Sequence, residues 1–203
     1  MTTIRAVIFD FGRVICDFDI GLFFQRAATR SAKSLRELEA VMTSSMDVAR
    51  RYETGLMTSD EFFGTISRLA SLHMQKDEFV KAYADIFTPI PATFDLVKRL
   101  KAHYRLGLLS NTNEWHFEYG IRPVEIFPLF DTVSLSYVVR SMKPDRGIYD
   151  DAIAKLGLPP EACAYIDDLP ANVEAGRALG LHAIRYTTHE ELIADLHRLG
   201  VDP

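Results

Sequence analysis

Short apolar runs alternate with amphipathic segments along most of the chain. Residues 4–9 form a β-branched-rich apolar run, which predicts a buried strand. The same reasoning predicts strands at 106–109, 131–135, 162–166 and 182–186, and helices at 93–103, 146–156, 171–179 and 189–199. Strands that alternate with helices form parallel βαβ units. The pattern therefore predicts an α/β fold with a doubly wound parallel sheet.

Residues 18–88 break this alternation and look entirely helical. Thr58 and Glu61 form a candidate capping box ahead of an apolar run, and Pro89 and Pro91 end the block. The block lies between the first and second strands, so it leaves and re-enters near the carboxyl end of the first strand, where ligands bind in such sheets. We therefore expect a core of residues 1–17 and 89–203 and a helical cap of residues 18–88 that covers the site.

Composition narrows the function classes. The 203 residues are 48% apolar and 25% charged, which is typical of a folded globular protein rather than a disordered one. The net charge of −5, without a basic cluster, disfavours nucleic acid and anionic membranes as partners. We expect neither a membrane helix nor a signal peptide, and we interpret Cys16 and Cys163 as reduced core residues of a cytoplasmic protein.

Polar residues follow several of the predicted strands at the point where each strand ends. Asp10 follows the first strand, Ser110 and Asn111 follow the second, and Asp167 with Asp168 follow the fourth. Lys143 lies in the segment after the third strand. Because parallel strands deliver their carboxyl ends to one edge of the sheet, we expect these groups to converge.

This mixture of groups suits phosphoryl transfer. Carboxylates hold a hard divalent cation such as Mg²⁺, which prefers oxygen ligands. The cation and a lysine would neutralise phosphate oxygens, and a serine hydroxyl and backbone N–H groups would bind the remaining ones. One carboxylate can attack phosphorus and form an aspartyl-phosphate.

At these residues the chain resembles the haloacid dehalogenase-like hydrolases. DFGRV resembles the first motif of that family, LLSNT the second, Lys143-Pro144 the third and YIDDLPAN the fourth, all in the family's order. The resemblance implies a Rossmann-like sheet of strand order 5-4-1-2-3 and a C1-type helical cap inserted after strand one. SNTNEWH and YETGLMTSDEF are most similar to the branch that contains α-glucose-1-phosphate phosphatase and the phosphatase domain of soluble epoxide hydrolase.

The resemblance also implies roles for the acidic residues. Asp10 corresponds to the nucleophile, and its second oxygen would bind magnesium. The carbonyl of Gly12 and the carboxylate of Asp168 would be further metal ligands, and Asp167 would bind the metal directly or through water. Asn172 would support this loop.

The remaining motif residues correspond to phosphate and substrate contacts. Ser110 and the Asn111 amide would hold the transferring phosphoryl group, and Lys143 would balance the charge of the nucleophile and the phosphate. Asn113 and His116 would face the cap and the substrate; alternatively, this segment only packs, with His116 on the solvent side.

Three positions depart from the family pattern. Gly12 stands where most phosphatases of the family carry a second aspartate, whose acid–base help is typically worth about 10²–10⁴-fold in rate. This predicts a preference for acidic leaving groups, unless Asp17 or His116 replaces the aspartate. Arg13 either reaches toward the cap to bind an anionic substrate or pairs with a surface carboxylate. Arg140 replaces a glycine, which could rearrange the loop that carries Lys143.

The favoured function is thus a Mg²⁺-dependent phosphatase of a small phosphometabolite, with sugar phosphates ahead of nucleotides, flavin mononucleotide and small acid phosphates. One alternative is a metal-independent 2-haloacid dehalogenase, against which the Asp167-Asp168 pair argues. The other is a catalytically weakened phosphate-binding or regulatory protein, for which Gly12 and Arg140 are the reasons.

Overall fold

The computed structural model describes residues 3–203, so the first two residues of the predicted core lie outside the described part. Five parallel strands form the main sheet: β1 (Ala6–Phe9), β4 (Arg105–Ser110), β5 (Thr132–Leu135), β6 (Cys163–Asp167) and β7 (His182–Arg185). Their order is β5-β4-β1-β6-β7 with β1 at the centre. The predicted order 5-4-1-2-3, read from the opposite edge, is confirmed.

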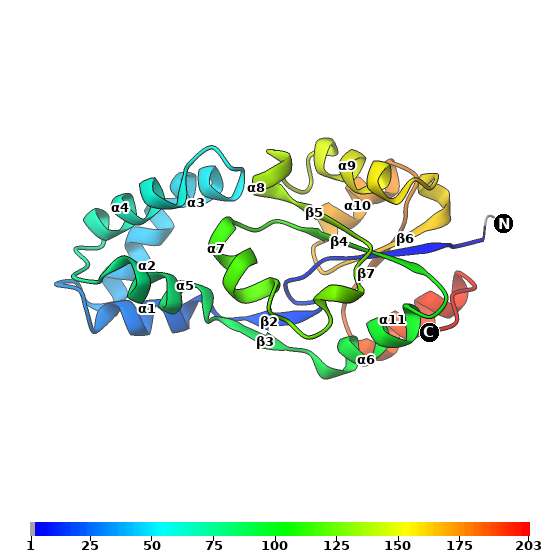
Figure 1. Cartoon of the computed structure of the whole chain (residues 1–203), viewed down its shortest axis with the longest axis horizontal. Coiled ribbons are helices and arrows are strands. Elements are labelled where there is room, and N and C mark those ends of the chain that lie inside the picture. Colours follow the sequence, from blue (N-terminus) through cyan, green and yellow to red (C-terminus); the bar gives the residue numbers. More distant parts are fainter. Residues whose placement is uncertain (1–2) are drawn as a thin grey trace.

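Helices cover both faces of this sheet (Figure 1). Because successive strand residues point to opposite faces, Val7 and Phe9 pack into one hydrophobic cluster and Ala6 and Ile8 into another. The first cluster is completed by helices α6 (Pro91–Leu100) and α11 (His189–Arg198), and the second by α9 (Arg146–Leu156) and α10 (Pro170–Ala178). A sheet buried on both faces explains why its strands are continuous apolar runs.

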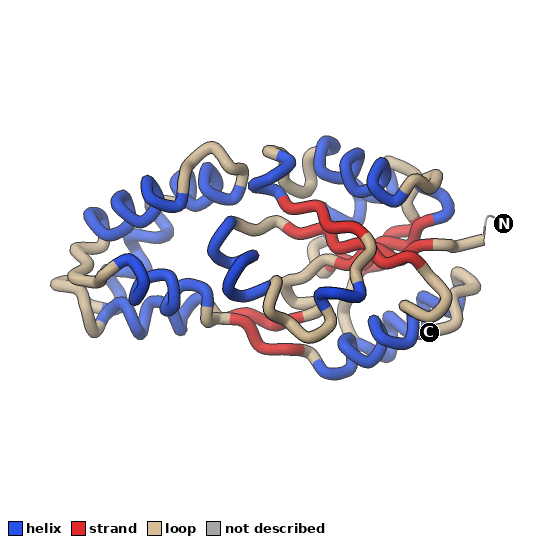
Figure 2. The backbone as a smooth tube through the Cα atoms, viewed as in Figure 1, coloured by secondary structure: helices blue, strands red, loops and turns tan. Residues whose placement is uncertain are grey.

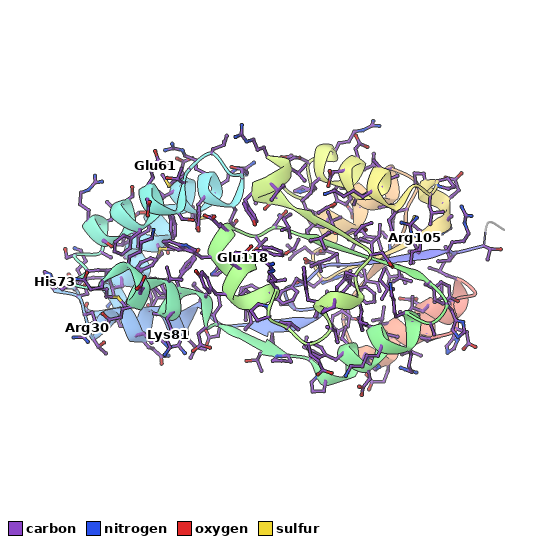
Figure 3. The ribbon with its side chains drawn as sticks, in the orientation of Figure 1. Arg30, Glu61, His73, Lys81, Arg105 and Glu118 are labelled. Carbon is purple, nitrogen blue, oxygen red and sulfur yellow. The ribbon has the colours of Figure 1, made fainter. Side chains whose placement is uncertain are left out.

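Five of the six helices between β1 and β4 form the group at the left of Figure 1: α1 (Ile20–Ala28), α2 (Leu35–Ser44), α3 (Met46–Glu53), α4 (Ser59–Leu69) and α5 (Lys76–Ala84). They have a hydrophobic core of their own, in which Phe62 and Phe79 are fully buried. The capping box of Thr58 and Glu61 at the start of α4 is confirmed. His73 lies at the outer end of this group, far from the sheet (Figure 3).

The expectation that residues 18–88 are entirely helical is wrong at both ends. Strand β2 (Cys16–Phe18) pairs antiparallel with β3 (Phe87–Pro89), and the two form a ribbon between the helical group and the core (Figure 2). Each strand has three residues, too few for an alternating pattern, and the whole helical group separates them in sequence. Only the folded chain brings them together.

Short helical segments were also missed: α7 (Glu114–His116), the π-helix η1 (Phe117–Ile121), the 3₁₀ turns η2 (Phe127–Leu129) and η3 (Pro160–Ala162), and α8 (Ser136–Val139). Trp115 of α7 packs into the core of the helical group. Cys16 and Cys163 are buried free thiols, as predicted. Within residues 3–203, no helix has the length and apolar character needed to cross a bilayer.

Candidate active site

The register of the central strands brings two carboxylates together. Phe9 pairs with Ile166 in the parallel ladder of β1 and β6, and the Asp10 backbone N–H donates to the Ile166 carbonyl at 2.9 Å. Asp10 and Asp167 are the next residues along these two strands. They therefore leave the sheet side by side at its carboxyl edge.

Lys143 bridges these two carboxylates. Its ammonium nitrogen lies 2.7 Å from Asp10 Oδ1 and 2.7 Å from Asp167 Oδ2, and its side chain is 1% exposed. Asn111 holds the lysine backbone at both ends: Lys143 N–H donates to Asn111 Oδ1 at 2.7 Å, and Asn111 Nδ2 donates to the Lys143 carbonyl at 2.9 Å. The side-chain amide of Asn111 therefore orients Lys143.

Arg13 and Arg140, two of the positions that depart from the family pattern, both adopt the left-handed backbone that favours glycine. Arg140 caps α8 with φ 59°, and Arg13 has φ 59° in the loop after Asp10. A left-handed conformation costs an L-residue roughly 1–2 kcal/mol. Because Arg140 accepts this conformation, the loop still delivers Lys143 to the two carboxylates.

Three carboxylates form a candidate metal centre. Asp10, Asp167 and Asp168 each offer an oxygen, and the three oxygens lie within 4.8 Å of one another. When all are ionised, Lys143 compensates one of three negative charges, and a divalent cation would balance the other two. Hard oxygen donors and this charge deficit fit Mg²⁺.

The carboxylates differ in their surroundings. Burial raises the pKa of Asp10 to about 7, with the attraction of Lys143 acting in the opposite direction. Burial also acts to raise the pKa of Asp167, but the charge and hydrogen bond of Lys143, together with a bond from the Tyr165 hydroxyl, hold it below its usual value. Burial raises the pKa of Asp168, and the nearby Asp167 adds to the effect. A bound cation would favour the ionised form of all three.

A cavity of about 210 Å³, here called the phosphate cavity, opens beside these groups. Its lining includes Asp10, Gly12, Arg13, Lys143 and Asp168. The Arg13 guanidinium carbon lies 5.4 Å from the centre of the Phe18 ring. Arg13 therefore stacks on an aromatic ring at the cavity wall, and among residues 3–203 no side-chain carboxylate lies within salt-bridge distance of it.

The Phe18 ring also occupies the space beside Gly12. A Cβ atom added at Gly12 would lie 3.0 Å from one carbon of that ring and 3.3 Å from another. A side chain at this position would require the ring to shift by a few tenths of an ångström. The sequence shows the missing carboxylate but not the aromatic ring that fills its place, because Phe18 comes from the β2–β3 ribbon.

The residues after β4 lie at different depths. Ser110 is buried, and among residues 3–203 its hydroxyl makes only a long 3.5 Å contact to the Asn111 carbonyl, which leaves it free for a ligand. Asn113 has no exposed surface; it accepts from His116 N–H at 3.0 Å and donates to the Tyr83 hydroxyl at 3.2 Å. Its side chain therefore caps α7 and does not line the phosphate cavity.

His116 is half-buried, and its ring contacts the helical group. Its Nε2 lies 3.1 Å from the Tyr83 carbonyl and its Nδ1 lies 3.0 Å from Asn113 Nδ2, and its ring stacks on Tyr83 at 4.2 Å between centroids. Burial lowers its pKa to about 4, so the ring is neutral at physiological pH. It lines a second cavity.

This second cavity, here called the cap–core cavity, measures about 290 Å³ and lies between the helical group and the sheet edge. Glu53, at the end of α3, is one of its lining residues. Glu53 was not among the predicted site residues, although it lies in the YETGLMTSDEF segment that resembles one branch of the family. Its position depends on contacts with the core.

Comparison with known proteins places these observations in a family. Residues 4–180 match the family model described as haloacid dehalogenase-like hydrolase. A D-ribitol-5-phosphate phosphatase of Bacteroides thetaiotaomicron is 26% identical over 189 residues, which cover 90% of this chain and 91% of that protein.

Solved structures agree in fold. A predicted HAD-like family hydrolase from Porphyromonas gingivalis has a TM-score of 0.78 at 26% identity, with all of both chains covered. A HAD family enzyme from B. thetaiotaomicron, solved in complex with magnesium and inorganic phosphate, has a TM-score of 0.79 at 21% identity, with 91% of this chain and 94% of that chain covered.

Proposed function

The chain belongs to the haloacid dehalogenase-like hydrolase family, and on that basis we propose that it is a magnesium-dependent phosphatase acting through an aspartyl-phosphate at Asp10. The observation that carries the proposal is the buried Lys143 ammonium, bonded to both Asp10 and Asp167 beside a third carboxylate. The substrate class is a small phosphorylated metabolite. The relative named D-ribitol-5-phosphate phosphatase supports sugar phosphates as members of that class.

In this proposal Asp10 attacks the phosphorus atom of the substrate. Its Oδ1 accepts hydrogen bonds from Lys143 Nζ and from the Phe11 N–H at 2.7 Å, which fix the orientation of the carboxylate. Attack forms an Asp10 O–P bond and breaks the bond between phosphorus and the ester oxygen. Water then attacks the same phosphorus, releases inorganic phosphate and restores the carboxylate.

The other groups hold the transferring phosphoryl group. The free hydroxyl of Ser110 and the backbone N–H of Asn111 would donate to phosphate oxygens, while Lys143 balances their charge. Asp10, Asp168 and the Gly12 carbonyl would hold Mg²⁺. Asp167, which already bonds Lys143 and Asn172, would bind it directly or through water. The ion would supply positive charge that stabilises the negative charge of the phosphoryl group.

The test measures phosphate release from a panel of phosphometabolites, with Mg²⁺ and with a chelator in its place. Asp10→Asn is compared with Asp95→Asn, a matched change at an exposed position of α6. We expect Mg²⁺-dependent release that is lost in Asp10→Asn and retained in Asp95→Asn. Release that persists in Asp10→Asn would refute Asp10 as the nucleophile.

The alternatives from the sequence give different results in the same experiment. Chloride release from 2-chloropropionate without metal, and no phosphate release, would indicate a haloacid dehalogenase. Tight binding of inorganic phosphate with no turnover of any panel member would indicate a phosphate-binding protein.

A further inference from the structure

The cap–core cavity adjoins the phosphate cavity. Gly12, Phe18 and Asn111 line both, so the two cavities share a wall at the place where the first motif meets the second. Ser110, which the proposed function assigns to the phosphoryl group, lines the cap–core cavity as well. The organic part of a substrate whose phosphoryl group lies at Asp10 would therefore extend into the cap–core cavity.

The walls of the cap–core cavity are mostly apolar. Three phenylalanines line it, Phe11, Phe18 and Phe87, and the aliphatic residues of the lining include Ile20, Met42 and Ile86. Phe11 and Phe87 pack edge to face at 5.4 Å between centroids. Aromatic and aliphatic walls favour an apolar ligand surface, because moving apolar surface out of water lowers the free energy.

Few polar groups in these walls remain for a ligand. Both ring nitrogens of His116 are occupied, and the Tyr83 hydroxyl accepts a bond from Asn113 and keeps one proton to donate. An open-chain polyol buried here would leave several of its hydroxyl groups without partners. A buried polar group without a partner loses its bonds to water and gains none in exchange.

Glu53 is the main polar residue of this cavity without a side-chain partner among residues 3–203, and a bond to the core holds its backbone in place. The Ser136 hydroxyl lies 2.6 Å from the Glu53 carbonyl and 2.9 Å from the Thr112 carbonyl, and it accepts from Thr112 N–H at 2.9 Å. One hydroxyl thus ties the end of α3 to the loop after β4. Burial raises the pKa of Glu53 to about 7, so near neutral pH its carboxyl can donate or accept one hydrogen bond.

We infer that the cap–core cavity binds the organic part of the substrate, and that it takes a flat ring-bearing group with one polar substituent directed at Glu53 in preference to an open-chain polyol. An apolar cavity of roughly 150 Å³ is enough to hold benzene. The 290 Å³ measured here holds a ring with substituents. The inference rests on the proposed phosphatase function and narrows its substrate class away from simple sugar-alcohol phosphates.

The test compares benzyl phosphate with D-ribitol 5-phosphate, two substrates that share a primary alkoxide leaving group and differ in the rest of their organic part. Acetyl phosphate, whose organic part is very small, reports the phosphatase activity itself. With Mg²⁺ present we expect kcat/KM for benzyl phosphate to exceed that for D-ribitol 5-phosphate by at least about tenfold, the scale on which apolar pockets discriminate. Because the leaving groups are alike, leaving-group acidity does not produce this difference.

The second measurement uses a substitution that fills the cap–core cavity. Ala49→Phe places a ring in the cap–core cavity, and Ala40→Phe places the same ring on the exposed face of α2. We expect the ratio of kcat/KM for benzyl phosphate to that for acetyl phosphate to fall at least about tenfold in Ala49→Phe and to stay unchanged in Ala40→Phe. Ala49→Leu makes the same test with a smaller side chain if Ala49→Phe does not fold.

The outcomes separate the two proposals. Hydrolysis of acetyl phosphate with equal or greater preference for D-ribitol 5-phosphate would overturn the cavity inference and leave the phosphatase function intact. An unchanged ratio in a folded Ala49→Phe would also overturn it. Failure to hydrolyse all three compounds would overturn the phosphatase proposal and the cavity inference together.

Discussion

Restoring the missing carboxylate at Gly12 tests why this site lacks an acid. The backbone of Gly12 does not require glycine, because its φ is not among the positive values. The obstacle is the Phe18 ring, which would meet an added Cβ at 3.0 Å, whereas carbon atoms pack best about 3.5–4.0 Å apart. Since Phe18 is 39% exposed, Phe18→Ala clears the space at modest cost.

The expected gain follows from the chemistry of the leaving group. An acid that protonates the ester oxygen is worth about 10²–10⁴-fold. That range corresponds to about 2.7–5.4 kcal/mol of barrier. We expect Gly12→Asp with Phe18→Ala to raise kcat for benzyl phosphate within this range relative to Phe18→Ala alone. Gly12→Asp by itself should gain less, because the ring must first move aside. Acetyl phosphate should change little, since its leaving group is already acidic.

The assay is steady-state phosphate release with Mg²⁺ for the wild type, both single variants and the double variant. Gly12→Asn with Phe18→Ala is the matched control, because it has nearly the same shape and carries no acidic proton. If the Asp and Asn double variants hydrolyse benzyl phosphate equally well, the absence of an acid at Gly12 does not limit the rate. The reasoning about leaving groups would then be wrong.

Three further predictions concern stability and pH. Lys143→Met leaves two buried carboxylates unpaired and should lower the free energy of unfolding by about 3–5 kcal/mol at pH 8. The loss should shrink toward pH 5 as the carboxylates protonate. A pH-independent loss in urea denaturation would contradict this prediction. Gly55→Ala should destabilise the folded protein by at least about 1 kcal/mol, because Gly55 has φ 66° and an added Cβ would lie 2.1 Å from the Tyr137 carbonyl oxygen. Gly64→Ala, with open space around it, is the control. Equal denaturation midpoints of the two variants would refute the contact. KM for benzyl phosphate should rise as pH passes about 7, because ionisation of Glu53 brings charge into an apolar cavity. The other titratable groups of this cavity, a tyrosine and a histidine, stay neutral. Glu53→Gln should remove the rise, and an unchanged pH profile in that variant would contradict the assignment.

Much of the fold was predictable because its signals are local. The apolar runs at β1, β4 and β6 and the helical periods between them depend on neighbouring residues, and parallel βαβ pairing follows from their alternation. The capping box of Thr58 and Glu61 lies within four residues. The predicted site residues Asp10 and Lys143 lie together because each follows a strand whose carboxyl end meets the same edge.

Other features had no local signal. The Phe18 ring reaches Gly12 because β2 pairs with β3 across the whole helical group. The sequence left open whether Asn113 and His116 face the substrate or only pack; the burial of α7 against the helical group gives their polar atoms protein partners, and His116 also lines the cap–core cavity. Sequence spacing alone does not show which side of a short helix will be covered.

The sequence by itself determined the parallel sheet, its strand order through the family motifs, and the polar residues that end its strands, since these depend on periodicity and on short segments. Only the tertiary structure decided what surrounds those residues. The bond from Ser136 that fixes Glu53 joins residues 83 positions apart. Contacts over such separations form only when the cap and the core pack together, and they determine the shape and polarity of the cavity that receives the substrate.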